Sequence, residues 1–525
     1  MPTPSLSRTA LITLVRQQAE TIARLEADNQ RLRAANDSLR EQLEVLHYRV
    51  SQMSRRIYGN TSERFIDTGQ QIIPGVVPAH RAVPDDEVER CALVQTSTAA
   101  QAAPPTRRAR RGRLALPGHL PREDRVIAPD PQTLSQPSGQ RLVKLRDEVT
   151  EKLDYIAGGF RVIRFIRPVY GVPHGDGMTV CAPPPPHVVA RGLPTDRLVA
   201  QVLCEKFDLH NPLYRQQQRF QRAGIDLPRS TLANWIGAAV RMLIPVVDAM
   251  ITTLRSSPVL GMDDTVIDRL APGLGRTHTG RFWGYTTSTT CVIQYADTRA
   301  GAHPQDFLAG WSGAIVADAY SGHEALYRTG DRIHVPCMVH VRRKFSDALK
   351  LANDTRAKPA LVLIRSLYRL EKHIRDQPPD VIAARRQRDA IPILTQLHHC
   401  VQTLASQATP KSPLGMACAY VLTLWPRLHR YTTDGRYPID NNAIERLWKP
   451  VALGRKNYLF VGNELGGERA AAAYTIVLSC RLNNIDPYHY LCDVFAELHA
   501  GKRTPDELTP AAWAKRNATV TDRVA

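Results

Sequence analysis

The sequence lacks the features that would place it in a membrane or in an oxidising compartment. Its nine cysteines are scattered singly and form no Cys-X-X-Cys pair, which argues against a disulfide framework and for a reducing compartment. No segment reaches the roughly 18 unbroken apolar residues of a membrane span. The first ten residues have neither the apolar core nor the cleavage site of an export signal. We therefore expect a cytoplasmic location and no membrane partner.

Acidic residues are scarce relative to basic ones. Asp and Glu number 50 against 69 Lys and Arg, which gives a net charge of +19. A field of this sign favours a polyanionic partner, and without a membrane segment nucleic acid is the better candidate. With 525 residues, the chain is long enough for about three to four domains.

The first recognisable element, residues 8–56, carries an apolar stripe with a 3.5-residue period. Such a period over about six heptads predicts a left-handed coiled coil, and Asn residues in the seam favour a parallel, in-register dimer. An amphipathic helix packed on its own domain is the alternative. The seam positions are Leu25, Asn29, Leu32, Asn36, Leu39, Leu43 and Leu46.

Residues 57–124 have the composition of a linker, rich in Pro and Ala and containing a basic run. Such a run is either a solvated tail or a nonspecific grip on phosphates, and the two interpretations are compatible. The arginines concerned are Arg107, Arg108, Arg110 and Arg111. Residues 125–190 then show strand-like alternation, as in Phe160–Arg167, and predict a small β module.

Residues 191–250 predict a helix-turn-helix region. Pro212–Ala223 reads as one helix, Gly224–Pro228 as a turn, and Ser230 as the N-cap of a second helix over Thr231–Val240. If the second helix enters a DNA groove, its first residues would contact the DNA. An ordinary helical hairpin is the alternative. The candidate contacts are Arg229, Thr231, Asn234 and Trp235.

From Val259 onward, short apolar segments alternate with helical ones. The sequence predicts strands over 259–262, 282–286, 292–296, 314–317 and 333–337, then a basic helix from His340 and an all-helical stretch over 346–435. Two acids, Asp263 and Asp318, directly follow predicted strands. A third, Glu445, lies beyond capping distance of the start of a predicted helix that Asp440 would cap.

Three converging carboxylates would suit Mg²⁺ or Mn²⁺, which prefer oxygen ligands. Two such ions roughly 3.5–4 Å apart activate an attacking oxygen and stabilise the leaving oxygen of a phosphodiester. A single Asp after a strand is more often a turn residue, so each acid alone is weak support. The expectation depends on all three lying together.

Five strings together resemble the insertion sequence 66 family of transposases. They are Met262–Thr265, Ala317–Tyr320, Cys337–Phe345, Asp440–Arg446 and Pro450–Phe460. The heptads, the segment Arg55–Arg64, Leu116–Pro121 and Thr509–Trp513 are also similar to that family, so the resemblance covers nearly the whole chain.

The resemblance implies a multidomain α/β protein with a ribonuclease-H-like DDE core over 256–345 and 436–465. A helical insertion would occupy 346–435 and a C-terminal helical segment 466–525. Asp263, Asp318 and Glu445 match the three catalytic, metal-holding acids, and Asp264 is a neighbour. Residues beside the metals or facing phosphate would be Asn441, Asn442, Arg446, His340, Arg342, Arg343, Lys344, Arg455 and Lys456. For the cluster from His340 to Lys344 we favour phosphate binding, and a solvated helix face is the alternative.

One departure from the family concerns zinc. The family usually carries paired cysteines before the helix-turn-helix region, whereas residues 125–190 offer only Cys181, His174 and His187 as soft ligands. Because a structural zinc site commonly takes four ligands, we expect no zinc and a sheet held by its apolar residues, which are Val162, Ile163, Phe165 and Ile166.

The sequence thus predicts a bacterial, nucleoid-associated transposase of an insertion element. It would bind the terminal inverted repeats and the target DNA as a homodimer or larger assembly, with two Mg²⁺ or Mn²⁺ ions and possible partners from the same element. The alternatives are a catalytically inactive accessory protein that binds DNA, and a nuclease or resolvase that uses the same acids.

Overall fold

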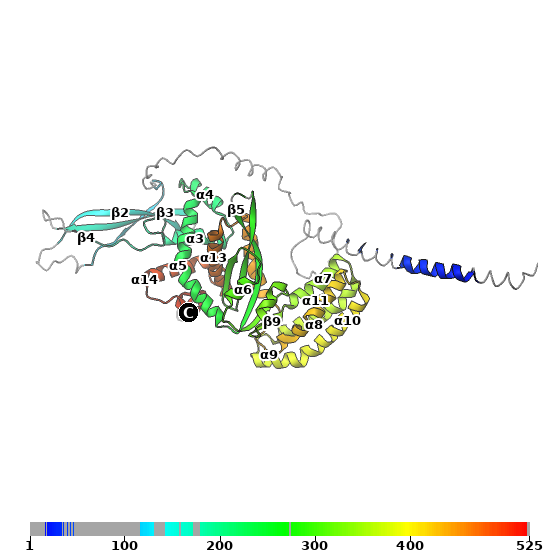
Figure 1. Cartoon of the computed structure of the whole chain (residues 1–525). Coiled ribbons are helices and arrows are strands. Elements are labelled where there is room, and N and C mark those ends of the chain that lie inside the picture. Colours follow the sequence, from blue (N-terminus) through cyan, green and yellow to red (C-terminus); the bar gives the residue numbers. More distant parts are fainter. Residues whose placement is uncertain are drawn as a thin grey trace, which may run out of the picture. The chain divides into compact units, whose positions relative to one another are not determined.

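The computed structural model describes residues 116–130, 142–156, 159–171, 179–271, 273 and 275–521, together with residues 16, 18–33, 35, 39, 42, 43 and 46 near the N-terminus. All the described N-terminal residues are helical and exposed (Figure 1). The seam leucines Leu25, Leu32, Leu39, Leu43 and Leu46 are between 57% and 67% exposed. Asn36 and the four linker arginines lie outside the described residues.

The β module contains β1 (Arg122–Val126), β2 (Val143–Ile156), β3 (Gly159–Gly171) and β4 (Thr179–Cys181). β3 is the central strand: it pairs with β2 in an antiparallel hairpin, with β1 in parallel and with β4 antiparallel. Of the four apolar residues expected to hold this sheet, three are buried and Ile166 is half-buried. The predicted linker boundary at residue 124 is wrong, because β1 begins at Arg122.

Three helices follow: α3 (Asp196–Phe207), α4 (Leu213–Arg222) and α5 (Arg229–Arg255). The turn between α4 and α5 falls where the sequence predicts it. Two details are wrong. α5 begins at Arg229, so Ser230 lies inside its first turn and is not the N-cap, and the helix continues fifteen residues beyond Val240, past the boundary at residue 250. The two helices are joined through an edge-to-face contact of Phe220 with Trp235.

α5 is the one described helix that is long and apolar enough, by length and composition, to cross a membrane. It also carries Arg241 and Asp248, and it packs against α3, α4 and α13. Its buried residues recur at helical spacing, from Leu232 to Leu254, as in a helix with one face in a protein core. We therefore treat α5 as a core helix.

The second sheet has five strands in the order β7-β6-β5-β8-β9. They are β5 (Val259–Ala271), β6 (Arg276–Thr286), β7 (Cys291–Ala296), β8 (Gly313–Ala317) and β9 (Arg332–Pro336). β5, β6 and β7 are antiparallel, whereas β5, β8 and β9 are parallel. The short helix α6 (Ala302–Phe307) precedes β8, and the 3-10 helix η2 (Ser321–Tyr327) follows it.

The sequence underestimates β5. The predicted strand ends before Asp263, but β5 continues eight residues beyond it, paired along its length with β6. What ends near Asp263 is the parallel ladder of β5 with β8, whose last pair is Gly261 with Val316. Asp263 therefore lies inside one strand but just past the end of one strand pair.

The edge of the sheet at β7 is covered by α13 (Glu464–Leu482). The backbone N–H of Cys291 donates to Ser479 Oγ at 2.9 Å, and that of Ile293 donates to Thr475 Oγ1 at 2.9 Å. Side-chain hydroxyls thus satisfy edge groups that would otherwise be open to another strand. α13 belongs with this sheet, so the predicted boundary at residue 466 divides one packing unit.

The stretch between β9 and residue 435 contains no strand, as the sequence predicts. It comprises α7 (Met338–Leu351), η3 (Thr355–Ala357), α8 (Lys358–Ile374), α9 (Pro379–Arg385), the π-helical turn η4 (Arg386–Ala390), α10 (Ile391–Gln407), α11 (Pro413–Leu428) and η5 (His429–Thr432). Their buried side chains form one core with β8 and β9. Arg386, only 3% exposed, pairs with Glu371 and donates to the carbonyls of Tyr431, Asp434 and Tyr437.

The chain then enters α12 (Asn442–Tyr458), returns to the sheet as α13, and ends in α14 (Pro487–Ala500), η6 (Asp506–Leu508) and α15 (Pro510–Thr521). Residue types that favour helix ends stand at both ends of α14. Asp486 caps it by accepting from the His489 N–H, Pro487 is its first residue, and Gly501 ends it in the left-handed conformation at φ 61°.

Candidate active site

The strand register brings Asp263 and Asp318 side by side. In the parallel ladder, Leu260 pairs with Ile315 and Gly261 pairs with Val316. Continuing this register by two residues sets Asp263 opposite Asp318, which follows the last residue of β8. The register therefore places both residues at the same edge of the sheet, and the charge of Asp318 contributes to the raised pKa of the Asp263 carboxyl.

Asp263 is half-buried and lies in a negatively charged environment. Burial raises the pKa of its carboxyl to about 7, and the charges of Asp318, Asp264 and Glu445 act in the same direction, against a hydrogen bond from the Asp264 N–H. The indole Nε1 of Trp448 donates to Asp263 Oδ2 at 3.0 Å. A carboxylate in such a place strongly favours a compensating cation.

A glycine makes room for that indole. Gly284 is the residue on β6 directly opposite Asp263, and a Cβ there would lie 2.7 Å from Trp448 Cζ2. The missing side chain lets the α12 tryptophan lie against the sheet and reach Asp263.

Asp264 faces the other side of β5, because consecutive strand residues point to opposite faces. Its side chain is 1% exposed and is held by two arginines: Arg281 Nη1 donates to Oδ2 at 2.8 Å, and Arg299 donates to Oδ1 from Nη2 at 2.8 Å. Asp264 is therefore already neutralised within the protein. This geometry supports treating Asp263, and not Asp264, as the candidate metal ligand.

Asp318 begins a loop that is tied back to the same arginine. Its Oδ1 accepts from the Tyr320 N–H at 3.2 Å and lies 3.5 Å from His323 Nδ1. Arg299 stacks over the Tyr320 ring at 3.8 Å, and the Tyr320 hydroxyl donates to the Arg299 carbonyl. Burial lowers the pKa of His323, which keeps that ring neutral beside Asp318.

Glu445 comes from the first turn of α12, where Asn441 fixes the start of the helix. Asn441 is 3% exposed; its Nδ2 donates to the Met262 carbonyl at 2.7 Å and its N–H to Cys337 Sγ at 3.2 Å. It thus clamps α12 beside Asp263 and does not face DNA. Glu445 itself lies 3.3 Å from Arg343 Nη2 and 3.8 Å from His340 Nδ1.

Of the other candidates for phosphate contact, some are exposed and others make hydrogen bonds within the protein. Arg455 is wrongly assigned: its Nη1 donates to Thr265 Oγ1 at 2.9 Å and to the Val266 carbonyl at 2.6 Å, so it holds α12 on β5. Lys456 and Arg446 are exposed on α12. Lys344 is exposed and lies 5.5 Å from the Tyr420 ring. Asn442 donates from its N–H and Nδ2 to Asp440, which satisfies the helix start.

The candidate DNA contacts on α5 also differ in their exposure to solvent. Arg229 and Asn234 are exposed and Thr231 is half-buried. Trp235 is 3% exposed. Its assignment as a DNA contact is therefore wrong, because its ring is part of the helix packing.

Sequence reasoning missed three residues near the acids. Trp448 lies three positions after Glu445, a spacing that places both on one side of a helix, and this was a usable signal. His323 and Arg299 carry no such signal, because their contacts with Asp318 and Asp264 arise only when separate loops come together.

The donor set suits hard divalent ions. Asp263, Asp318 and Glu445 offer the oxygen ligands that such ions prefer, but their carboxylate oxygens do not all lie within 4.8 Å of one another. The raised pKa of Asp263 indicates that negative charge is poorly compensated at its position. In the β module the potential soft ligands are dispersed: Cys181 lies near Glu148, and His187 faces Asp196 at 3.6 Å. His174 lies outside the described residues, and the absence of zinc from this module stays a prediction.

Comparison with known proteins identifies the family. The family described as "Transposase IS66 family" matches residues 191–469, more than half of the chain. The chain belongs to this family. A second family, described as "Transposase C of IS166 homeodomain", matches residues 45–125, which include the end of the predicted zipper. The transposase domain begins at α3 and extends into α13, so DNA is a partner of this insertion-sequence transposase, as the sequence predicts.

Relatives of similar length occur in Sinorhizobium fredii. The uncharacterized protein y4hP is 33% identical over 503 residues, covering 90% of this chain and 89% of the relative. The uncharacterized protein y4jD is 32% identical over 408 residues, covering 75% of this chain and 80% of the relative. The similarity to y4hP thus extends well beyond the transposase domain alone.

Proposed function

We propose that this IS66 family transposase is an active DDE enzyme that cleaves the ends of its element and joins them to target DNA. The observation that carries the proposal is the register of β5 and β8, which sets Asp263 beside Asp318, with Glu445 supplied by α12. Burial is the main cause of the raised pKa of Asp263, and the charges of Asp318 and Glu445 add to it, which supports the proposal.

The strand order supports a ribonuclease-H-like core. In the antiparallel β5-β6-β7 meander continued by parallel β8 and β9, Asp263 lies on the central strand β5 and Asp318 directly follows its neighbour β8. We assign this core to 256–345 and 436–482, with the helical insertion at 346–435 between the second and third acids. The later end of the core reflects the contacts of α13 with β7.

The chain's residues would hold Mg²⁺ or Mn²⁺ through Asp263, Asp318 and Glu445. When bound, the two ions would supply an activated oxygen nucleophile and charge stabilisation at the leaving oxygen. Trp448 would keep Asp263 in one orientation through its indole N–H, and Asn441 would hold the start of α12 against β5. Arg343 would lie close enough to contact a phosphate brought to Glu445.

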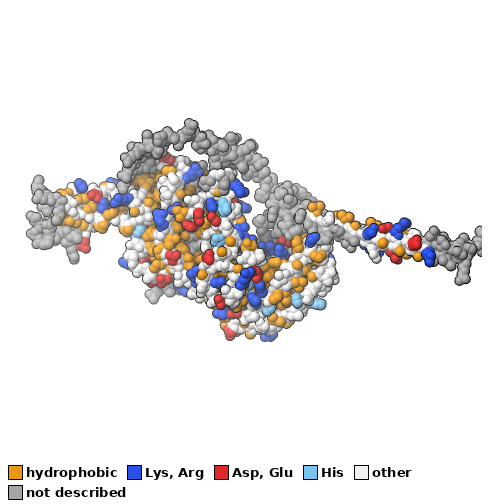
Figure 2. Space-filling view, in the orientation of Figure 1, with side chains coloured by type: hydrophobic (Ala, Val, Ile, Leu, Met, Phe, Trp, Pro, Cys, Tyr) orange, Lys and Arg blue, Asp and Glu red, His pale blue; other side chains and the backbone are white. Residues whose placement is uncertain are grey.

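We further propose that α4 and α5 read the terminal inverted repeats. The exposed residues at the start of α5, Arg229 and Asn234, would face DNA. Lys and Arg side chains are spread over the visible face of the described residues (Figure 2), as suits a protein that neutralises phosphates of two DNA segments. Such a protein would act on the nucleoid, in the cytoplasm.

The N-terminal helix would join two copies. Its described leucines are exposed in the single chain and lie among basic and acidic side chains (Figure 2). A row of leucines at heptad spacing needs a partner helix to bury it, and an identical helix supplies the same row in register. A dimer would then present two catalytic cores to two element ends.

The test is a Mg²⁺-dependent assay on DNA that carries the element's own ends. The wild-type protein should nick the ends and transfer the freed 3′-hydroxyl to a target, and Asp318→Ala should bind ends without cutting them. Cleavage by the Asp318→Ala protein would refute the metal-site assignment. End binding without cleavage by the wild type, with any divalent ion, would instead favour the inactive accessory protein.

A further inference from the structure

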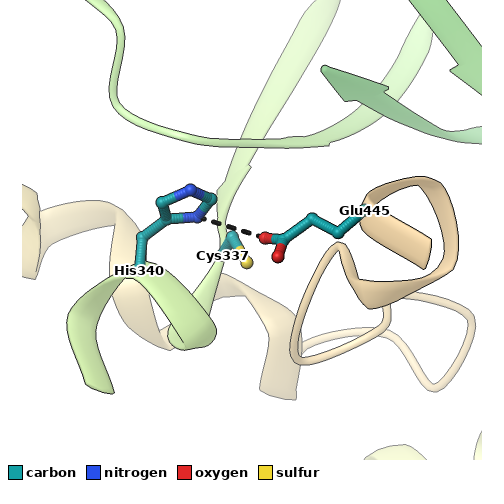
Figure 3. A group of neighbouring side chains, drawn as sticks. All are labelled: Cys337, His340 and Glu445. Atoms are coloured by element: carbon teal, nitrogen blue, oxygen red, sulfur yellow. Dashed lines mark ion pairs between the residues drawn. The ribbon is translucent and has the colours of Figure 1, made fainter. Parts of the chain in front are cut away.

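A second group of potential metal ligands lies beside Glu445. Cys337 Sγ, a ring nitrogen of His340 and a carboxylate oxygen of Glu445 all lie within 4.8 Å of one another. Figure 3 shows the His340 ring and the Glu445 carboxylate pointing toward each other, with Cys337 next to both. Among the described residues this is the one group of three or more His, Cys, Asp or Glu side chains whose ligand atoms all lie within 4.8 Å of one another.

The chemistry of this group differs from that of the three acids. Sulfur and imidazole ligands select borderline and soft ions such as Zn²⁺, whereas Mg²⁺ prefers oxygen. Three protein ligands would leave a fourth, open position on a tetrahedral ion, as in zinc sites that bind water or substrate. We propose that Cys337, His340 and Glu445 form a site for Zn²⁺ or a similar thiophilic ion.

The backbone around Cys337 is suited to a thiolate. Cys337 occupies the N-cap position of α7, a helix of 14 residues, where the helix dipole favours negative charge. The Asn441 N–H donates to its sulfur at 3.2 Å. Without a metal, burial raises the pKa of the thiol to about 12. An ion would therefore have to displace the thiol proton to solvent, as metals do at cysteine ligands.

The spacing explains how two elements build the site. Cys337 and His340 are three residues apart and lie on one side of the first turn of α7. Glu445 approaches from α12, and the same Asn441 that bonds to Cys337 starts that helix. The side chains of His340 and Glu445 are 22% and 21% exposed, so an ion can enter from solvent.

Occupation of this site would have a consequence for catalysis. Glu445 would be engaged by the soft ion and withdrawn from the pair Asp263 and Asp318. Zn²⁺ would then inhibit Mg²⁺-dependent cleavage. This consequence depends on the proposed role of Glu445, whereas the metal site itself depends only on the three side chains.

Cobalt provides the direct test, because Co²⁺ replaces Zn²⁺ and shows a thiolate-to-metal absorption band when sulfur is a ligand. The full-length protein should bind one Co²⁺ with this band, and excess Mg²⁺ should leave the band in place. Cys337→Ser and His340→Gln should each weaken Co²⁺ binding at least about tenfold, and Cys337→Ser should abolish the band. Cys400→Ser, on α10, is the matched control and should retain it.

A band that persists in Cys337→Ser, or no Co²⁺ binding by the wild type, would overturn the proposal. Thermal melting of each variant checks that folding is intact, and His340→Gln decides the matter if Cys337→Ser fails to fold. In a parallel cleavage assay, the Zn²⁺ concentration that halves wild-type activity should rise about tenfold in His340→Gln. A wild-type protein that binds Co²⁺ through Cys337 but never cleaves DNA would refute the proposed function and leave the site standing.

Discussion

Asp263 and Asp264 are consecutive residues on β5, and their carboxylates lie on opposite faces of the strand with different partners. Asp264 is enclosed by two arginines, which neutralise its charge inside the protein. The Asp263 carboxylate accepts hydrogen bonds from an indole N–H and a backbone N–H, and the charges of two further acids, Asp318 and Glu445, act on it. One face thus uses a carboxylate to hold loops together, whereas the other leaves a carboxylate short of positive charge.

The difference teaches how a strand can serve structure and chemistry at once. The Asp264 face ties β6 and the loop before α6 to the centre of the sheet. Through Arg299 and Tyr320, it also fixes the loop that carries Asp318. Asp263 has no such positive partner, so a metal ion could supply the compensating positive charge.

The largest effect should come from exchanging the acid on the metal-facing side. Asp263→Asn should lower DNA cleavage on the order of 10³-fold or more, because an amide is a much poorer ligand for Mg²⁺. The variant should still fold and bind the element's ends. Cleavage rates with element ends in Mg²⁺ provide the measurement, and a loss below about tenfold would place the metal elsewhere.

Asp264→Ala should act on stability instead. It leaves Arg281 and Arg299 without their buried carboxylate, at a cost on the order of 3 kcal/mol of unfolding free energy. Urea denaturation would measure it. Asp268→Ala, on the same face of β5, is the control. The Asp268 carboxylate accepts a hydrogen bond from the Thr279 hydroxyl, and its loss should change stability by less than about 1 kcal/mol. Equal losses for the two variants would contradict the contrast between the faces.

The pH dependence of stability should also separate the two residues. The pKa of Asp263 is about 7 in the folded protein and 3.8 ordinarily, so without divalent ions the folded state holds a proton that the unfolded state has lost. Stability therefore falls as pH rises from about 4 to 7 and then levels off. Asp263→Asn should raise the melting temperature at pH 8 but not at pH 4.5.

This gain in the metal-free protein should amount to a few kcal/mol at most, and added Mg²⁺ should reduce it by stabilising the wild type. Melting curves at the two pH values, with and without Mg²⁺, test the sign. A variant that is less stable than the wild type at pH 8 without metal would show that Asp263 is not strained by its burial.

The smallest effect concerns the support of Asp263 by α12. Trp448→Phe keeps a ring over Gly284 but removes the N–H that holds Asp263 Oδ2. Cleavage should fall about tenfold, the equivalent of ~1.4 kcal/mol for one hydrogen bond to a charged group. Single-turnover rates at saturating Mg²⁺ would show it. An unchanged rate would mean that Asp263 needs no orientation from α12.

The sequence was informative wherever local pattern decides structure. The strands of the second sheet, the start of α14 and the turn before α5 follow from short-range periodicity and capping. The three acids were found through their surrounding strings, and the position of Asp263 and Asp318 at one edge of the sheet follows once β5 and β8 pair in parallel. Of the three, Glu445 was distinguished by lying too far into its helix to cap it.

Other features depend on contacts between distant segments and could not be predicted. The length of β5 was missed because its second half, rich in polar residues, is stabilised by pairing with β6. Trp235 was predicted to contact DNA because it lies near the start of α5. Its burial depends on packing against Phe220 of another helix, which the local sequence does not reveal. α13 packs on β7, and Arg455 donates hydrogen bonds to β5. Both contacts join residues more than 180 positions apart in the sequence.

The most direct test of the central claim is to locate Mn²⁺ in crystals of the protein by its anomalous scattering. The account predicts metal density between the carboxylates of Asp263 and Asp318, with Glu445 within reach, and the Arg281–Asp264–Arg299 cluster free of metal. An ion coordinated by Asp264, or no metal between Asp263 and Asp318 in a protein that cleaves DNA, would contradict it.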